Sequence, residues 1–141
     1  MVAPGAIDLI DTPTWRDLPN DYQNREYHAH NRLIASVTMH KEERREMARL
    51  IAQKMKLAKG AAAFFLPKKG IEEWDREGNP LHDADGHEAF CEEMRSWIPH
   101  TVHFEDLDVH INDKEFSQAV LRLFDQWIDQ GIISTSATSK S

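Results

Sequence analysis

Side chains that can do chemistry are concentrated in residues 106–113, which follow a short apolar run and open an amphipathic stretch. The segment holds three acids, the imidazole of His110 and the amide of Asn112. His110 lies between Asp108 and Asp113, so a nearby carboxylate can orient its ring for hydrogen bonding or for general base catalysis. Asp108 and His110 are therefore the candidate acid–base pair. The structural alternative is a histidine that ties this turn to backbone carbonyl groups.

Two other segments are expected to meet this one at the carboxyl ends of parallel strands. They are Pro4-Gly5, after a short strand that ends at Val2-Ala3, and Pro67-Lys68-Lys69-Gly70. Ammonium groups, a glycine that permits close approach and the free N–H groups of a helix start together favour an anion. The predicted phosphate-binding residues are Gly5, Lys68, Lys69, Gly70, His110, Asn112 and Asp113.

The alternative to this phosphate site is that Lys68 and Lys69 are merely hydrated and that Asn112 only caps its helix. The sequence contains no Walker A pattern and no GxGxxG loop, so neither common nucleotide fingerprint supports the prediction.

Metal binding is suggested first by the acidic loop after Gly70. Its acids could hold Mg²⁺ beside a phosphate ligand, although such a loop is more often merely hydrated. They are Glu72, Glu73, Asp75, Glu77 and Asp83. The eight histidines form no HExxH or CxxC-type pattern; zinc held by histidines and aspartates from distant loops stays open as an alternative, because such ligands leave no local pattern, and we assign no specific metal ligands. Cys91 is interpreted as a buried structural cysteine in an amphipathic helix.

Three alternations of strand and helix must position these residues. Apolar runs predict strands at residues 33–37, 61–66 and 101–105, with a further short pairing at 6–10 and a surface loop at 11–24. Helical periodicity with capping residues predicts the three helices. The first spans residues 38–59 with Thr38 as its cap, and the second spans residues 84–97 with Asp83 or Asp85 as its cap. The last runs from its cap, Asn112, to Gly131. This order is typical of an α/β fold in three layers, in which a small, mostly parallel sheet has helices on both faces. Such an arrangement is a Rossmann-like half domain.

Length, charge and composition limit the kinds of protein to which this chain can belong. The 141 residues suffice for one domain at most, the net charge is -7, and no basic tract points to nucleic acid or to an anionic membrane surface. Without a long apolar run or a signal-peptide pattern, we expect a cytoplasmic protein. The abrupt start suggests a fragment, and exposed sheet edges predict cover by an upstream subdomain or by a second copy. Residues 132–141 are expected to form a disordered tail.

Several motifs resemble one family. They are VAPGAIDLID, YHAHN, LPKKG, GNPLHDADGHEAF and HIND before the terminal helix. In this order they are similar to the Tm-one-like ATP-binding family, the family of the tomato mosaic virus resistance protein, which is largely uncharacterised in bacteria and fungi. The resemblance covers residues 2–131, and its most specific matches are residues 110–113 and Pro4-Gly5 with Asp8.

The resemblance implies two α/β subdomains, of which this chain supplies much of the second, Rossmann-like one. It also implies ATP or a related phosphate ligand and, in the plant member, binding and inhibition of a viral replication protein. No established reaction comes with the family. Three functions therefore remain: a nucleotide- or phosphate-binding module, an enzyme that uses His110 and Asp108, or a non-catalytic interaction and assembly fragment.

Overall fold

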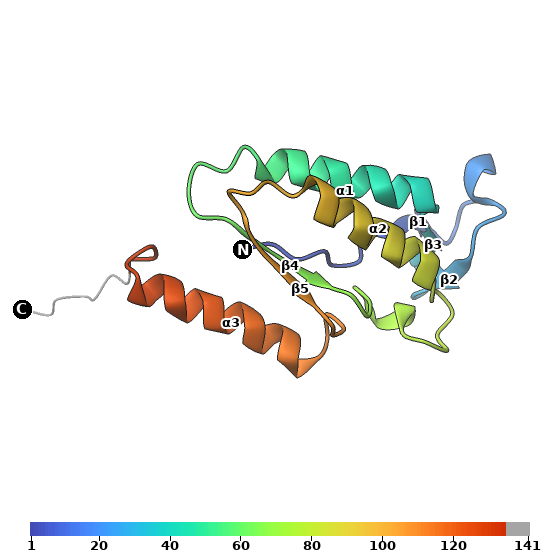
Figure 1. Cartoon of the computed structure of the whole chain (residues 1–141). Coiled ribbons are helices and arrows are strands. Elements are labelled where there is room, and N and C mark those ends of the chain that lie inside the picture. Colours follow the sequence, from blue (N-terminus) through green and yellow to red (C-terminus); the bar gives the residue numbers. More distant parts are fainter. Residues whose placement is uncertain (135–141) are drawn as a thin grey trace, which may run out of the picture.

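The computed structural model describes residues 1–134 and contains three α-helices and two small sheets (Figure 1). The elements in chain order are β1 (Leu9–Pro13), η1 (Asn20–Tyr22), β2 (Tyr27–Ala29), β3 (Ile34–Thr38), α1 (Lys41–Met55), β4 (Ala63–Pro67), η2 (Glu73–Asp75), α2 (Ala84–Trp97), β5 (His103–Leu107) and α3 (Lys114–Asp129).

The central layer is the parallel pair of β4 and β5, with the N-terminal segment against the other edge of β4. Val2 forms a parallel bridge to Phe64, in which the Val2 amide donates to Ala63 O and the Phe65 amide donates to Val2 O. The predicted strand end at Val2 is therefore confirmed. Because these segments are parallel, Gly5 follows the same end of the sheet as the loop after β4.

Helices cover both faces of β4, whose residues are all buried. Phe64 and Leu66 face one core, which is shared with α1 and α2, whereas Ala63 and Phe65 face a second core, which is shared with α3. This alternation follows from the two-residue period of a strand, and an apolar run is what a strand covered on both faces requires. Figure 1 shows the same arrangement, with α1 and α2 on one side of β4–β5 and α3 on the other. The predicted α/β class is confirmed.

The strand at residues 33–37 was expected in the parallel sheet, and this expectation is wrong. β3 lies in a separate three-stranded antiparallel sheet, of order β1-β3-β2. The side chain of Asn31 accepts hydrogen bonds from the amides of Leu33 and Ile34, which stabilises a tight turn between β2 and β3. A turn of this length returns the chain antiparallel, since a parallel connection needs a crossover of about a dozen residues. β1 also occupies part of the predicted 11–24 loop.

At two of the three helix starts, the N-cap residue differs from the predicted one. Thr38 pairs with Leu9 at the end of β3, and α1 begins after His40, whose amide donates to the carboxylate of Glu43. The N-cap of α3 is Asp113, one residue beyond the predicted Asn112.

Other boundaries are closer to prediction. Asp83 caps α2, as one of the two predicted alternatives, and α1 ends at Met55, before the expected residue 59. Of the predicted tail, residues 135–141 lie outside the described part of the chain. Within residues 1–134, no helix combines the length and the apolar character that a bilayer crossing demands.

Candidate functional site

A pocket of about 320 Å³ lies beside the carboxyl end of β4, between the loop that follows this strand and the start of α2. Its walls come from α1, the two loops after β4 and the first turns of α2. They are formed by Arg44, Lys68, Lys69, Gly70, Asp75, His82, Asp83, Ala84, Asp85, His87 and Glu88. Three of the predicted phosphate-binding residues, Lys68, Lys69 and Gly70, are thus brought together in one cavity wall.

Both lysines are partly free to contact a ligand. Their backbone amides donate to Leu107 O and Val109 O, which fixes the loop against the end of β5. Their ammonium groups lie 3.9 Å (Lys68) and 3.2 Å (Lys69) from the carboxylate of Asp108, which is 72% exposed. Exposed ion pairs of this kind stabilise a protein by only about 0–1 kcal/mol, so an anion could replace Asp108 with little loss.

The start of α2 forms another part of the pocket lining. The carboxylate of Asp83 accepts a hydrogen bond of 2.9 Å from the Gly86 amide, and its other oxygen lies 3.1 Å from Arg44 Nη2. Gly86 leaves room for this cap, since a Cβ there would overlap the Asp83 carboxylate. The first amides of a helix have no intrahelical acceptors and carry partial positive charge, which favours an anion at this end of the pocket.

His110 lies beside Gly70 and Asp75, and both nitrogens of its ring are hydrogen-bonded. Its Nδ1 accepts from the Asn112 amide at 3.1 Å, so Nε2 carries the proton in the neutral ring. Nε2 donates to Asp75 Oδ1 at 2.8 Å and to Glu72 O at 3.0 Å. The carboxylate that orients this histidine is therefore that of Asp75, whereas the sequence suggested Asp108 or Asp113.

The ring of His110 is only 1% exposed, and Asp108 points towards the lysines instead. The two predicted acid–base partners are not brought together, because Asp108 lies at the surface and His110 faces inward. In this structure His110 connects the turn before α3 to the loop after β4, which matches the structural alternative.

Gly70 serves the packing of this histidine. Its φ is +126°, a conformation that other residues rarely adopt. A Cβ at this position would overlap Asp75 Oδ1 and come within 2.6 Å of His110 Cδ2. The close approach that the sequence attributed to a ligand is made by the protein's own Asp75–His110 pair.

The remaining predicted residues lie outside the pocket wall. The Asn112 side chain donates to Glu73 at 2.9 Å, and Asp113 accepts from Arg76 and from the His110 amide at 3.0 and 2.9 Å. These hydrogen bonds lower the pKa of Asp113, the one from the His110 amide most strongly. Gly5 is exposed and adjoins Ala6, whose amide donates to Ile71 O. Of the predicted phosphate-binding residues, Lys68, Lys69 and Gly70 therefore line the pocket at the start of α2, and anion binding at the start of α3 stays a prediction.

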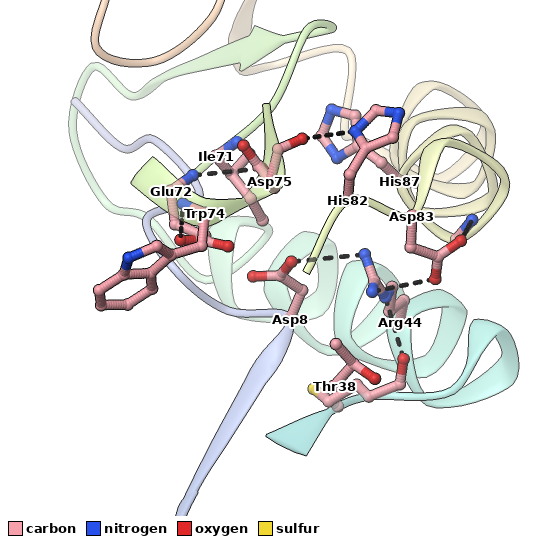
Figure 2. A network of polar contacts seen from close by, with 12 residues as sticks. Asp8, Thr38, Arg44, Ile71, Glu72, Trp74, Asp75, His82, Asp83 and His87 are labelled. Carbon is pink, nitrogen blue, oxygen red and sulfur yellow. Dashed lines mark hydrogen bonds and ion pairs between the residues drawn. The ribbon is translucent and has the colours of Figure 1, made fainter. Parts of the chain in front are cut away.

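The buried carboxyl groups of three residues meet next to the pocket. They are Asp8, Glu72 and Asp75. One ligand oxygen from each lies within 4.8 Å of the others. Figure 2 shows Asp8 between Glu72 and the guanidinium of Arg44, which it contacts at 3.4 Å. Arg44 is itself buried and bridges Asp8 to Asp83.

These three residues, Asp8, Glu72 and Asp75, form an acidic cluster, and burial dominates the electrostatics of Asp8 and Glu72 within it. Desolvation raises the pKa of Asp8, against the opposing effect of Arg44. Desolvation also raises the pKa of Glu72 to about 7, an effect that the Trp74 amide opposes and the other two acids reinforce. Sequence reasoning did not assign Asp8 or Arg44 to a site. The only signal was Asp8 in the family motif, since Arg44 lies in a charged helical run that is typical of a solvated face.

Cys91 is buried on α2, as predicted. Burial raises the pKa of its thiol to about 12, and Sγ lies 3.6 Å from His87 Nε2, which itself lies 2.9 Å from Pro67 O. A buried thiol with a raised pKa is protonated at neutral pH, which agrees with a structural cysteine.

Comparisons with known proteins identify relatives of this chain. The model of the family described as "Uncharacterised protein family (UPF0261) C-terminal domain" matches residues 1–128. A UPF0261 protein of Brucella melitensis biotype 1 is 47% identical over 133 residues, which cover 94% of this chain and 32% of the relative. A UPF0261 protein of Clostridium tetani is 28% identical over 123 residues, which cover 86% of this chain and 30% of the relative.

The chain is also similar to the ToMV resistance protein Tm-1 of Solanum lycopersicum, at 25% identity over 126 residues, which cover 88% of this chain and 17% of that protein. The chain thus spans less than a third of the length of these relatives. The family resemblance that the sequence motifs predicted is confirmed.

Proposed function

The chain belongs to the C-terminal domain family of UPF0261, whose function is uncharacterised, and we propose that its pocket binds the phosphate group of a small ligand. The observation that carries this proposal is the placement of Lys68 and Lys69 in one pocket with the start of α2. Ammonium groups and the partly positive start of a helix are both complementary to a phosphate. The only acidic partner of both lysines among the described residues is the exposed Asp108, which a ligand can displace.

The dimensions and lining of the pocket limit the ligand. A volume of about 320 Å³ is near the lower end of the range for ligand sites. Among the described residues, its lining includes no Phe, Tyr or Trp on which a base could stack. Asp75, Asp83, Asp85 and Glu88 also limit the negative charge that the pocket tolerates. ATP, which the family resemblance implies, would therefore be held through its phosphates, and Mg²⁺ would reduce their repulsion from these acids.

Calorimetric titration tests this proposal with tripolyphosphate, ATP and inorganic phosphate, each with and without Mg²⁺. We expect tripolyphosphate and ATP to bind with similar affinity, because this chain offers the base no aromatic contact. Lys68→Ala should weaken both by several-fold to tenfold, in line with about 1 kcal/mol for one partly screened charged contact.

The matched control is Lys114→Ala, which removes an exposed lysine at the start of α3, where the sequence first suggested the phosphate. Its affinity should equal that of the wild type. Equal losses in the two variants would mean that only the net charge matters, and an absence of saturable heat would reject the phosphate proposal.

A second role, as an interaction or assembly domain, is favoured by an apolar surface at the end of α3. Met1, Phe124 and Ile132 are 42%, 40% and 48% exposed and line one hollow together with Trp127. Since the chain spans 32% of its Brucella relative, this surface suits contact with another domain or a second copy. Light scattering of the wild type and of Phe124→Asp tests the second-copy version, because a dimer at this surface should dissociate in the variant.

A further inference from the structure

We propose that Asp8, Glu72 and Asp75 bind one divalent cation of the oxygen-seeking class, such as Mg²⁺, Mn²⁺ or Ca²⁺. The three residues come from the loop before β1 and from the turn around η2, and they converge in the folded chain. Figure 2 shows the carboxyl groups of Asp8 and Glu72 directed towards each other beneath Asp75.

The first support is the state of the carboxylate oxygens. Asp8 Oδ2 contacts Arg44, and Glu72 Oε2 accepts from the Trp74 amide at 2.6 Å. The other two, Asp8 Oδ1 and Glu72 Oε1, are fully buried and have no hydrogen-bond partner. Their residues are only 2% and 7% exposed. A buried acceptor without a partner is unfavourable by about 1–3 kcal/mol, and by more when it is charged, so these two oxygens call for either a shared proton or a cation.

The spacing of the oxygens fits a cation. Oxygen ligands lie about 2.0–2.1 Å from Mg²⁺ and about 2.3–2.6 Å from Ca²⁺, so ligands on opposite sides of one ion are roughly 4–5 Å apart. The three carboxylates place one oxygen each within 4.8 Å of the others. Their ligand set contains oxygen alone, which suits hard cations and disfavours a structural zinc site.

The charge balance points the same way. Arg44 is the cationic side chain that contacts Asp8, and the ring of His110 donates one hydrogen bond to Asp75. Three ionised carboxylates would therefore leave an excess of negative charge in a buried volume, which is strongly unfavourable. Either a proton or a cation must offset it. Asp75 and Arg44 also line the pocket, so the cluster adjoins this cavity. The cation site does not depend on the phosphate proposal, because none of its ligands is a lysine or a helix amide.

The test is a titration of the 141-residue chain with Mn²⁺ alone, in phosphate-free buffer at about pH 8, above the pKa of Glu72, which is about 7. Electron paramagnetic resonance counts the bound ions. We expect one ion per chain and a rise in the melting temperature. Glu72→Gln, which keeps the shape but removes one charge, should weaken Mn²⁺ by at least about tenfold, as ligand-shell changes do. It should still fold, because it relieves repulsion among the acids.

The matched control is Glu77→Gln, the same substitution at an exposed position of the same loop. It should bind Mn²⁺ like the wild type. Nuclear magnetic resonance of the wild type gives a second readout that needs no variant, since bound Mn²⁺ should broaden the amides of Asp8 and residues 71–75 first.

The proposal is overturned if no saturable binding occurs up to about 1 mM Mn²⁺, near the weakest affinity of protein cation sites. It is equally overturned if broadening is centred on exposed acids such as Asp108, or if Glu77→Gln and Glu72→Gln lose affinity alike. In each of these cases the carboxyl groups share a proton instead.

Discussion

Replacing Gly70 by alanine tests whether this glycine exists for the Asp75–His110 pair. The added methyl group meets two obstacles. The φ of +126° is strained for any residue with a Cβ, and the methyl group would come within 2.6 Å of His110 Cδ2 while overlapping Asp75 Oδ1. The variant must therefore either distort its backbone or separate the acid from the imidazole.

The magnitude follows from these two effects. Backbone strain of this kind amounts to about 1–3 kcal/mol. Loss of the 2.8 Å hydrogen bond between a buried carboxylate and His110 adds about 1.5–3 kcal/mol. The sum, about 3–6 kcal/mol, is a large part of the 5–15 kcal/mol by which domains are usually stable. For a chain of this size, we expect the melting temperature to fall by roughly 10–20 °C.

Two glycines act as internal controls in the same calorimetric or urea unfolding assay. Gly78 has φ +87° but no atom within 4 Å of its Cβ position, so Gly78→Ala measures strain alone. Gly5 has open space and no positive φ, so Gly5→Ala should be nearly neutral. The reasoning is refuted if Gly70→Ala and Gly78→Ala lose equal stability, because the contact with Asp75 and His110 would then contribute nothing.

Three further predictions concern buried groups. Because the pKa of Glu72 is about 7 in the folded chain against 4.5 ordinarily, folding favours its protonated form. With a chelator present to remove divalent cations, the stability of the chain should therefore fall as the pH rises from about 4.5 to 7. Glu72→Gln should flatten this part of the plot of melting temperature against pH. Cys91, whose thiol pKa is raised to about 12, should resist a thiol reagent at pH 8 in the native state and react fully in denaturant. Arg44→Met leaves Asp8 and Asp83 without their buried partner and should lower the free energy of unfolding by about 3–5 kcal/mol in urea titration.

The parts of the fold that the sequence predicted well are those decided by local pattern. The apolar stripe of α3 places Phe116, Ala119 and Leu123 in the core as its helical spacing required. The run in β4 is buried on both faces, as an uninterrupted apolar strand should be. The sheet partner of β3 could not be predicted in this way. A short apolar run indicates burial but carries no information on its neighbour, which here was decided by the turn at Asn31.

The difference between local pattern and tertiary contact also explains which residues of the candidate site could be predicted. Lys68, Lys69 and Gly70 were found because a loop after a strand is visible in the sequence. The contact between Asp8 and Arg44 joins residues 36 positions apart, and nothing local distinguishes Arg44 from its exposed neighbours. His110 was singled out for its neighbours in sequence, whereas its real partner, Asp75, lies 35 residues away. Tertiary contacts of this separation are set by packing and leave no periodic signal.

Asp75 belongs both to the pocket wall and to the acidic cluster, so the two proposed sites are electrostatic neighbours. Ionised carboxyl groups in the cluster raise the free energy of a phosphate in the pocket, and a divalent cation there lowers it. Linkage makes this effect reciprocal: the factor by which Mn²⁺ tightens phosphate binding must equal the factor by which phosphate tightens Mn²⁺ binding. Coupling of this kind typically amounts to about 5–150-fold. If saturating phosphate leaves Mn²⁺ affinity unchanged, once direct Mn²⁺–phosphate association is subtracted, then Arg44 screens the pocket from the cluster and the two sites act independently.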